Sequence, residues 1–106
     1  MMEQVYRFST GNERAVEKVI QDENIHYIHM VFGAGEGLPV HTTNAVVYMT
    51  VVRGTLRLRL GGGEAREYPN GTVVRIPKGM LMDASNAGGT TMELIVVKAP
   101  APAAQA

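Results

Sequence analysis

The chain has 106 residues, of which 45% are apolar, so it is long enough for one hydrophobic core and too short for a second domain. Its ten Lys and Arg residues balance ten Asp and Glu residues, and this formal charge of zero argues against nucleic acid or an anionic membrane as a partner. Zero cysteines exclude disulfides and thiolate metal sites. No window approaches the roughly 18 apolar residues of a membrane span, and no signal peptide is visible at the start, so we expect a soluble cytoplasmic protein.

Short β-prone runs broken by glycine or proline follow one another along the chain, which is typical of an all-β sandwich or barrel. We predict strands at 5–8, 16–21, 25–32, 45–52, 55–60, 65–68, 72–76, 81–85 and 91–97. In the second of these regions, Asn12 could instead cap a helix, because the apolar residues that follow it fall on one side. A strand that turns at 22–24 fits the rest of the pattern better. We assign residues 1–99 to a single domain and 100–106 to a flexible tail.

The clearest predicted strand is 55–60, where leucines alternate with Arg57 and Arg59. Because Gly54 stands between this strand and the preceding apolar run, we predict a tight hairpin at Arg53-Gly54 in which the glycine takes a positive φ.

Two runs, 45–52 and 94–97, are apolar at successive positions instead of alternating. Such a pattern indicates strands that are covered on both faces, whereas a barrel wall has only one inner face. We therefore expect a homodimer that forms through an apolar sheet face.

Two glycine-anchored patterns carry the strongest signal in the sequence. Gly35 is followed at fixed spacings by His41, Thr43, Val47 and Gly54. The second pattern runs through Gly71, Pro77, Gly79, Met82 and Asn86.

These spacings resemble the paired motifs of the cupin superfamily, G-x5-H-x-H-x3-E-x6-G and G-x5-P-x-G-x2-H-x3-N, over residues 35–86. The whole chain is also similar to a group of small single-domain prokaryotic cupins of unassigned function. The resemblance implies a double-stranded β-helix, which is a jelly-roll-like barrel.

The chain departs from the family at the positions that carry the metal. In metal-binding cupins, three histidines and one glutamate hold a divalent ion, and the corresponding residues here are His41, Thr43, Val47 and Met82. Valine cannot coordinate, and threonine and methionine are poor ligands for such ions. We therefore expect no cofactor, and any divalent metal would have to be held by His41 together with His29.

Three functions remain open. The first is binding of a small molecule in the barrel cavity, in a pocket formed by His29, His41, Thr43, Val47, Met49 and Met82. The second is a metal-independent enzyme of the isomerase or epimerase type, with His41 as acid or base and Tyr48 assisting. The third, which we rank last, is a divergent metal-dependent enzyme that uses His41 and His29. We favour the alternative for His29, which is a strand histidine that bonds to a neighbouring backbone group or a water.

Overall fold

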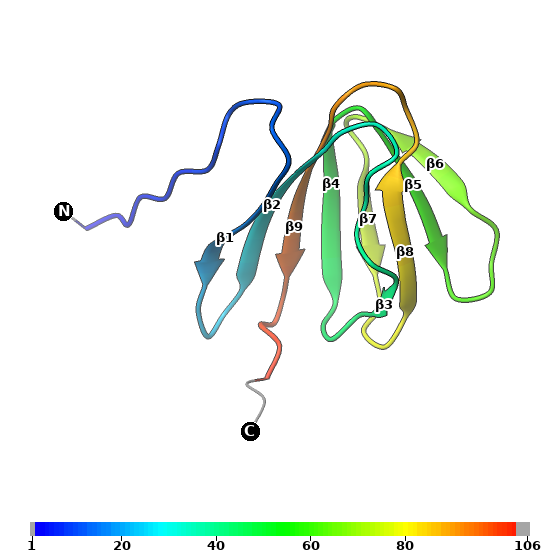
Figure 1. The fold of residues 1–106 in the computed structure, drawn as a ribbon. Helices are drawn as coiled ribbons and strands as arrows, with labels where there is room; N and C mark the ends of the chain where they lie inside the picture. Colours follow the sequence, from blue (N-terminus) through cyan, green and yellow to red (C-terminus); the bar gives the residue numbers. More distant parts are fainter. Residues whose placement is uncertain (1, 104–106) are drawn as a thin grey trace.

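The computed structural model describes residues 2–103, which form nine β-strands and no helix (Figure 1). The strands are β1 (Ala15–Gln21), β2 (His26–Phe32), β3 (His41–Thr42), β4 (Val47–Arg53), β5 (Thr55–Leu60), β6 (Arg66–Pro69), β7 (Val73–Ile76), β8 (Leu81–Asn86) and β9 (Met92–Lys98). In this part of the chain no helix is long and apolar enough to cross a membrane. The all-β fold class predicted from the sequence is confirmed.

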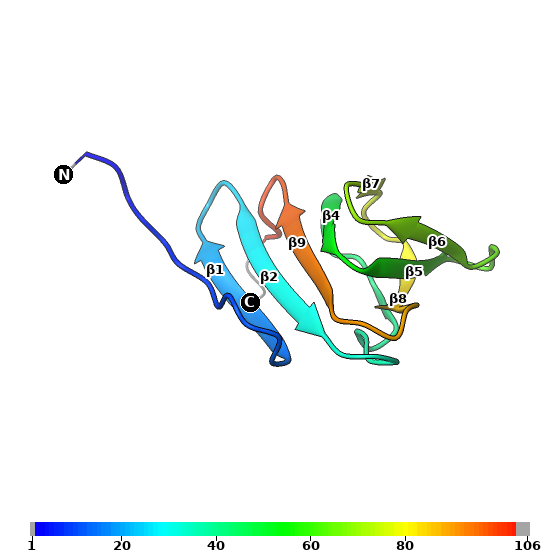
Figure 2. The same ribbon diagram turned by 90° about the horizontal axis from the view of Figure 1, so that it is seen from above.

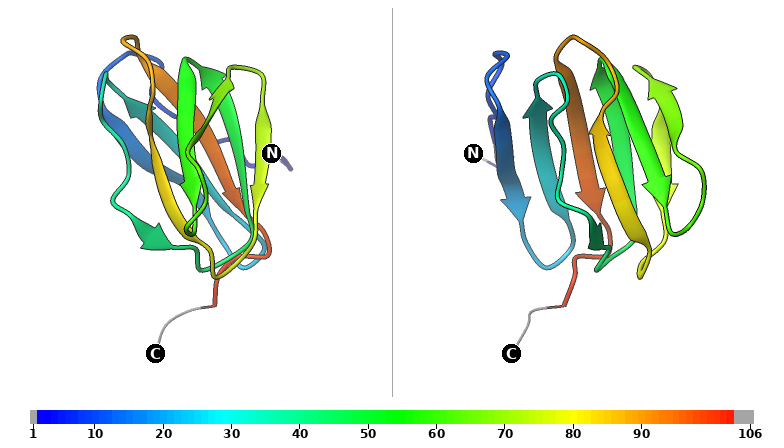
Figure 3. Two further views of the ribbon diagram at one scale, coloured as in Figure 1. Left: turned by 90° about the vertical axis from the view of Figure 1, so that its right-hand side faces the viewer. Right: turned by 45° about the vertical axis from the view of Figure 1, so that its right-hand side comes forward.

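The strands form two antiparallel sheets that face each other. The five-stranded sheet has the order β1-β2-β9-β4-β7, and the four-stranded sheet has the order β3-β8-β5-β6. Seen from above, β1 lies at the edge of the larger sheet that is furthest from the smaller sheet (Figure 2). The side views show the strands of the smaller sheet in front of those of the larger one (Figure 3).

Strict alternation along the strands places the hydrophobic core between the two sheets. On β2, Ile28, Met30 and Phe32 face inward and are at most 7% exposed. The other strands contribute Val47, Met49, Val51, Leu56, Leu58, Ile76, Met82, Ala84, Met92, Leu94 and Val96. Burial of each large apolar side chain stabilises the fold by about 1.5–3 kcal/mol, so this continuous core is the main force that holds the sheets together.

The ambiguous region near the start of the chain is a strand and not a helix, as we predicted. Residues 15–21 form β1, which pairs with β2 along its length. The turn between the two strands is closed by Asp22, whose carboxylate accepts hydrogen bonds from the backbone N–H groups of Asn24 and Ile25. The strand predicted at 5–8 is wrong, because these residues are extended but pair with no other strand in the described chain.

The predicted hairpin at Arg53-Gly54 is also wrong, although Gly54 does have a positive φ of 77°. β4 belongs to the larger sheet and β5 to the smaller one, so the chain changes sheets at Gly54 instead of folding back on itself. A Cβ atom at this corner would lie 2.6 Å from the carbonyl oxygen of Thr91, which leaves room only for glycine. Strand alternation cannot reveal such a change of sheet, because both β4 and β5 keep an inward apolar face.

The remaining motif positions also shape the corners of the fold. Gly35, Gly71 and Gly79 all have positive φ angles. The side chain of Asn86 is buried, and its amide donates to the carbonyl oxygens of Phe32, Gly33 and Thr90. The second half of the motif therefore fastens the end of β8 to the loops around it.

The described chain leaves the barrel at both of its ends. At the C-terminus, the backbone N–H of Ala101 donates to the carbonyl oxygen of Asn24, and residues 104–106 of the predicted tail lie outside the described residues. At the N-terminus, the segment before β1 runs across the outer face of the larger sheet and then projects away from the molecule (Figures 1 and 2).

Candidate functional site: an apolar pocket with a histidine and a lysine

A small cavity opens between the sheets at the end of the barrel where β3 lies. Its volume is about 90 Å³, and its lining consists of Ile28, Met30, Leu38, His41, Val47, Met49, Met82, Val96 and Lys98. Seven of these nine residues are apolar, and the two that are not, His41 and Lys98, carry nitrogen.

Cross-strand register explains why these residues meet. In the larger sheet, Ile28, Val96 and Met49 lie in one row across β2, β9 and β4. Lys98 and Val47 lie opposite each other in the next inward-facing row. The smaller sheet closes the pocket from the other side, where His41 of β3 pairs with Met82 of β8.

His41 has one ring nitrogen engaged and the other free. Its Nδ1 lies 2.8 Å from the carbonyl oxygen of Pro39, and because a carbonyl can only accept, Nδ1–H is the donor. In the described part of the chain Nε2 has no protein hydrogen-bond partner. The bond to Pro39 thus fixes the ring and leaves Nε2 for a ligand.

Lys98 lines the pocket, and our sequence analysis missed it. It is half-buried, and its ammonium group lies 2.9 Å from the side-chain oxygen of Asn44. Burial, reinforced by repulsion from Lys18, lowers the pKa of Lys98 from its ordinary value of 10.5. The period of two through Leu94 and Val96 would have placed it on the inner face, so the signal was present in the sequence.

The structure brings together four of the predicted pocket residues, namely His41, Val47, Met49 and Met82. Thr43 is not among the lining residues. Its hydroxyl donates to the carbonyl oxygen of Pro77 and accepts from the N–H of Met80, so it locks the loop before β8. Tyr48 faces outward on β4 and is 37% exposed, with Arg75 above its ring, so it cannot assist His41.

His29 lies on the opposite face of the larger sheet, so its predicted place in the pocket is wrong. Its neighbours Ile28 and Met30 point into the core, and a residue between them must point away from it. The ring is fully buried because Phe8 stacks on it from the N-terminal segment, at 4.0 Å between ring centroids.

Two carboxylates hold His29 in place. Its Nδ1 lies 2.7 Å from Glu17 and its Nε2 lies 2.6 Å from Glu93, and Glu93 also accepts a hydrogen bond from Arg53 at 2.7 Å. We call Glu17, His29, Arg53 and Glu93 the outer cluster. It also ties down the N-terminal segment, because Ser9 donates to Glu17 and Arg53 donates to Asn12 and to the carbonyl oxygen of Gly11.

The charges of the outer cluster compensate one another. The hydrogen bonds from His29 and then from Ser9 lower the pKa of Glu17. Burial acts to raise the pKa of Glu93, but the hydrogen bonds from His29 and Arg53 outweigh it, so this pKa also lies below its ordinary value. Ionised carboxylates can only accept, and each ring nitrogen of His29 therefore acts as an N–H donor.

The residues at the four motif positions do not fit the metal centre that the cupin resemblance implies. Of these four residues only His41 offers a nitrogen or oxygen lone pair to the pocket, since the Thr43 hydroxyl is used within the fold, Val47 is a hydrocarbon and Met82 has only a soft thioether sulfur. Within residues 2–103, no group of three or more His, Asp or Glu side chains is arranged to hold a metal ion. His29 cannot supplement His41, because it faces the other side of the sheet and both its nitrogens are bonded to carboxylates.

A larger hollow of about 730 Å³ lies beside the turn between β1 and β2, next to residues 101–103. It is a broad surface depression, and the carboxylate of Asp22 within it already serves the turn. The smaller, mostly apolar pocket at His41 is the better candidate because enclosed apolar surface is what binds small organic molecules.

Comparison with known proteins supports the architecture. No family model matches the sequence. An uncharacterized protein of Methanocaldococcus jannaschii is 33% identical over 103 residues, which cover 96% of this chain and 89% of that protein.

Solved structures agree with this relationship. A crystal structure of an RmlC-like cupin family protein with a double-stranded β-helix fold from M. jannaschii superimposes with a TM-score of 0.93 at 33% identity, covering 96% of this chain and 94% of the other. An RmlC-like cupin protein from Desulfovibrio desulfuricans has a TM-score of 0.76 at 24% identity, with 95% and 98% coverage, and so supports the fold alone. Given the paired motifs, the two facing sheets and a cupin relative that matches almost from end to end, this chain belongs to the RmlC-like cupin family.

Proposed function

We propose that the protein binds a small, largely apolar molecule in the pocket at His41, without the help of a metal. The observation that carries this proposal is the form of the pocket, in which apolar side chains surround a histidine whose Nε2 is free. Recognition sites for small molecules combine apolar lining with a few fixed polar groups in this way.

The size of the cavity limits the ligand. A cavity of about 150 Å³ suffices for benzene, and the present one measures about 90 Å³. Only a few carbon atoms can therefore enter between Met49 and Met82, and any polar group of the ligand must remain at the mouth with His41. Methionine side chains are flexible, so the lining can adapt to ligands of somewhat different shape.

Methionine methyl groups provide a direct test. Met30, Met49 and Met82 line the pocket, whereas Met92 is fully buried in the core and is not part of the lining. In a protein labelled with ¹³C at the methionine methyls, a library of small molecules should yield ligands that shift the signals of the three pocket methionines and leave that of Met92 in place. Failure of every compound to shift these three signals would refute the proposal.

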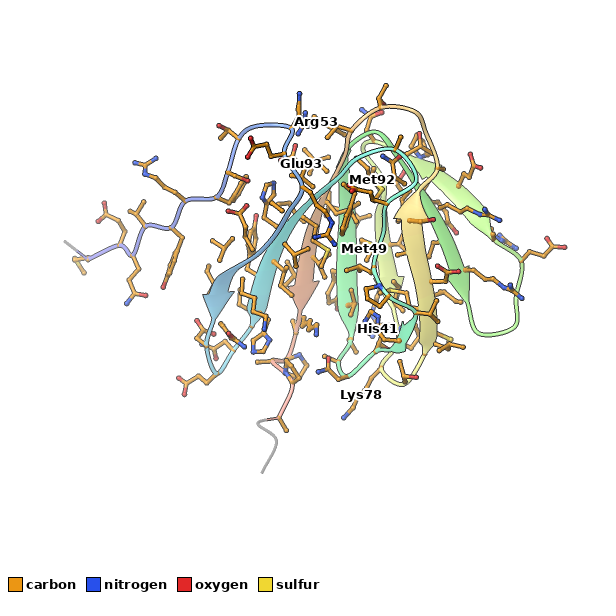
Figure 4. The ribbon with its side chains drawn as sticks, in the orientation of Figure 1. His41, Met49, Arg53, Lys78, Met92 and Glu93 are labelled. Carbon is orange, nitrogen blue, oxygen red and sulfur yellow. The ribbon has the colours of Figure 1, made fainter. Side chains whose placement is uncertain are left out.

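The variant His41→Gln tests the role of the free nitrogen. Because glutamine cannot reproduce the fixed imidazole, a ligand that binds wild type should bind the variant about tenfold more weakly, while its apolar part still shifts the pocket methionines. Lys78→Met is a suitable control, since Lys78 lies at the same end of the molecule but is not part of the lining (Figure 4).

An enzymatic alternative is favoured by the presence of Lys98 beside His41. Two nitrogen groups at one mouth could move a proton to and from a bound molecule, as an isomerase or epimerase requires. Incubation of candidate ligands in D₂O would reveal it as exchange of a carbon-bound proton for deuterium, lost in His41→Gln. Ligands that bind without exchange would favour the binding function.

A further inference from the structure

The mouth of the pocket carries a positive charge that no acidic side chain within residues 2–103 neutralises. Lys98 belongs to the lining, and the lining contains no Asp or Glu. Throughout residues 2–103, the ion pairs join only the members of the outer cluster, so no carboxylate pairs with Lys98. The groups that face it from neighbouring strands are Lys18, His26 and His41, none of which is an acid.

Hydrogen bonding leaves this ammonium group with spare capacity. An ammonium has three N–H donors, and the structure assigns one of them to the side-chain oxygen of Asn44. Asn44 thereby holds the end of a long side chain at the mouth, where the other two donors can reach an acceptor. A half-buried cation without a counter-charge is costly unless a partner supplies one.

We infer that the ligand of this pocket is a short apolar carboxylate, whose anionic head binds Lys98 while its hydrocarbon part enters between Met49 and Met82. The inference rests on the function proposed above and adds the chemical class of the ligand. His41 stands at the same mouth, where a protonated Nε2 would donate to the second oxygen of the head group, because a carboxylate oxygen can only accept. A cation placed over an apolar cavity of about 90 Å³ is complementary to this class of molecule in both charge and shape.

The electrostatic state of Lys98 agrees with this assignment. Burial, followed by repulsion from Lys18, lowers the pKa of the free group below 10.5, which means that the empty pocket disfavours the charge. A bound carboxylate would offset both effects and raise the pKa again. Linkage then requires that the carboxylate bind most tightly below the lowered pKa of free Lys98, and that its affinity fall as the pH rises through that value.

A matched pair of probes tests the ligand class. 3-Methylbutanoate and 3-methylbutanamide have the same shape but differ in charge, and binding of each can be followed by the methyl signals of Met30, Met49 and Met82. In wild type the carboxylate should bind about tenfold more tightly than the amide or better, as charge-assisted hydrogen bonds require. In Lys98→Met, which keeps the length of the side chain, this preference should disappear, whereas the control Lys78→Met should retain it.

The results separate the two proposals. If the amide binds wild type as well as the carboxylate, or if Lys98→Met keeps the preference, the assignment of a carboxylate ligand is wrong while the pocket remains a binding site. If carboxylates of all lengths from acetate to hexanoate leave the three methyl signals in place but neutral molecules shift them, the assignment is again wrong. If neither carboxylates nor neutral molecules shift them, the proposed function itself fails.

Discussion

The molecule contains two histidine sites that use the same ring in opposite ways. His29 is fully buried, and each of its nitrogens bonds to a carboxylate. His41 stands at the mouth of a pocket, with one nitrogen bonded to Pro39 and the other free. Figure 4 shows His41 at one end of the barrel and Arg53 and Glu93 of the outer cluster at the other.

The difference shows how a structural histidine can be told from one available to a ligand. In the outer cluster, two acidic and two basic side chains form ion pairs with one another, and these side chains also hold the N-terminal segment in place. At the pocket, no acid within residues 2–103 pairs with Lys98 or His41, and their remaining hydrogen-bonding capacity is available to a ligand. Replacement of histidine by glutamine should therefore reduce mainly the stability of the fold at His29 and mainly the affinity for a ligand at His41.

The largest effect is expected for His29→Gln. Glutamine cannot donate to both Glu17 and Glu93, so it leaves partly buried carboxylates without their partner and loosens the stack with Phe8. We expect the free energy of unfolding to fall by about 3 kcal/mol. Urea denaturation would measure it, and a loss no larger than that of His41→Gln would show that the outer cluster does not stabilise the fold.

Acid should weaken the outer cluster next. The pKa values of Glu17 and Glu93 are lower in the folded protein than their ordinary value of 4.5, so these groups contribute stability that is fully present above 4.5 and is lost as the pH falls through the lowered values. The midpoint of urea unfolding should drop over this range. Glu93→Gln should show a shallower dependence, and the exposed control Glu67→Gln should follow wild type; identical curves for all three would contradict the assignment.

The smallest effect on stability is expected for His41→Gln. The residue is exposed, and its only hydrogen bond in the described chain goes to the neighbouring carbonyl of Pro39, so the free energy of unfolding should change by about 0.5 kcal/mol or less. Its effect should appear instead in ligand affinity. If His41→Gln lost much stability but bound ligands as wild type does, His41 would be a structural residue like His29.

Much of the fold could be predicted from the sequence because the buried and exposed faces of a strand appear as apolar and polar residues at alternate positions. The alternation of leucine and arginine at 55–60 predicted the bounds of β5, and the motif glycines predicted positive φ angles that the structure shows. The strand at 5–8 failed because its apolar side chains have no core to face within one chain. The predicted hairpin at Gly54 is wrong because a glycine at the end of a strand is compatible both with a hairpin in one sheet and with a connection to the opposite sheet.

The candidate site was predictable in part for the same reason. His41, Val47, Met49 and Met82 were found from the motif and from alternation, and both signals are local. Thr43 was assigned to the pocket because the motif gives its position but not the bonds that its hydroxyl makes with Pro77 and Met80. Lys98 was overlooked because a charged residue at the end of a strand was not weighed as part of the inner face.

By itself, the sequence determined the all-β class, the corners of the barrel and the loss of the usual metal ligands, since these depend on residue type and spacing along the chain. Only the tertiary structure decided that His29 belongs to a closed cluster with Glu17 and Glu93, and that Lys98 joins His41 at an apolar pocket. Those groupings bring together residues up to 76 positions apart in the sequence, between Glu17 and Glu93, and up to 57 apart, between His41 and Lys98. The physical reason is that charge compensation and cavity lining depend on which strands become neighbours, and strand order is set by the packing of the whole core.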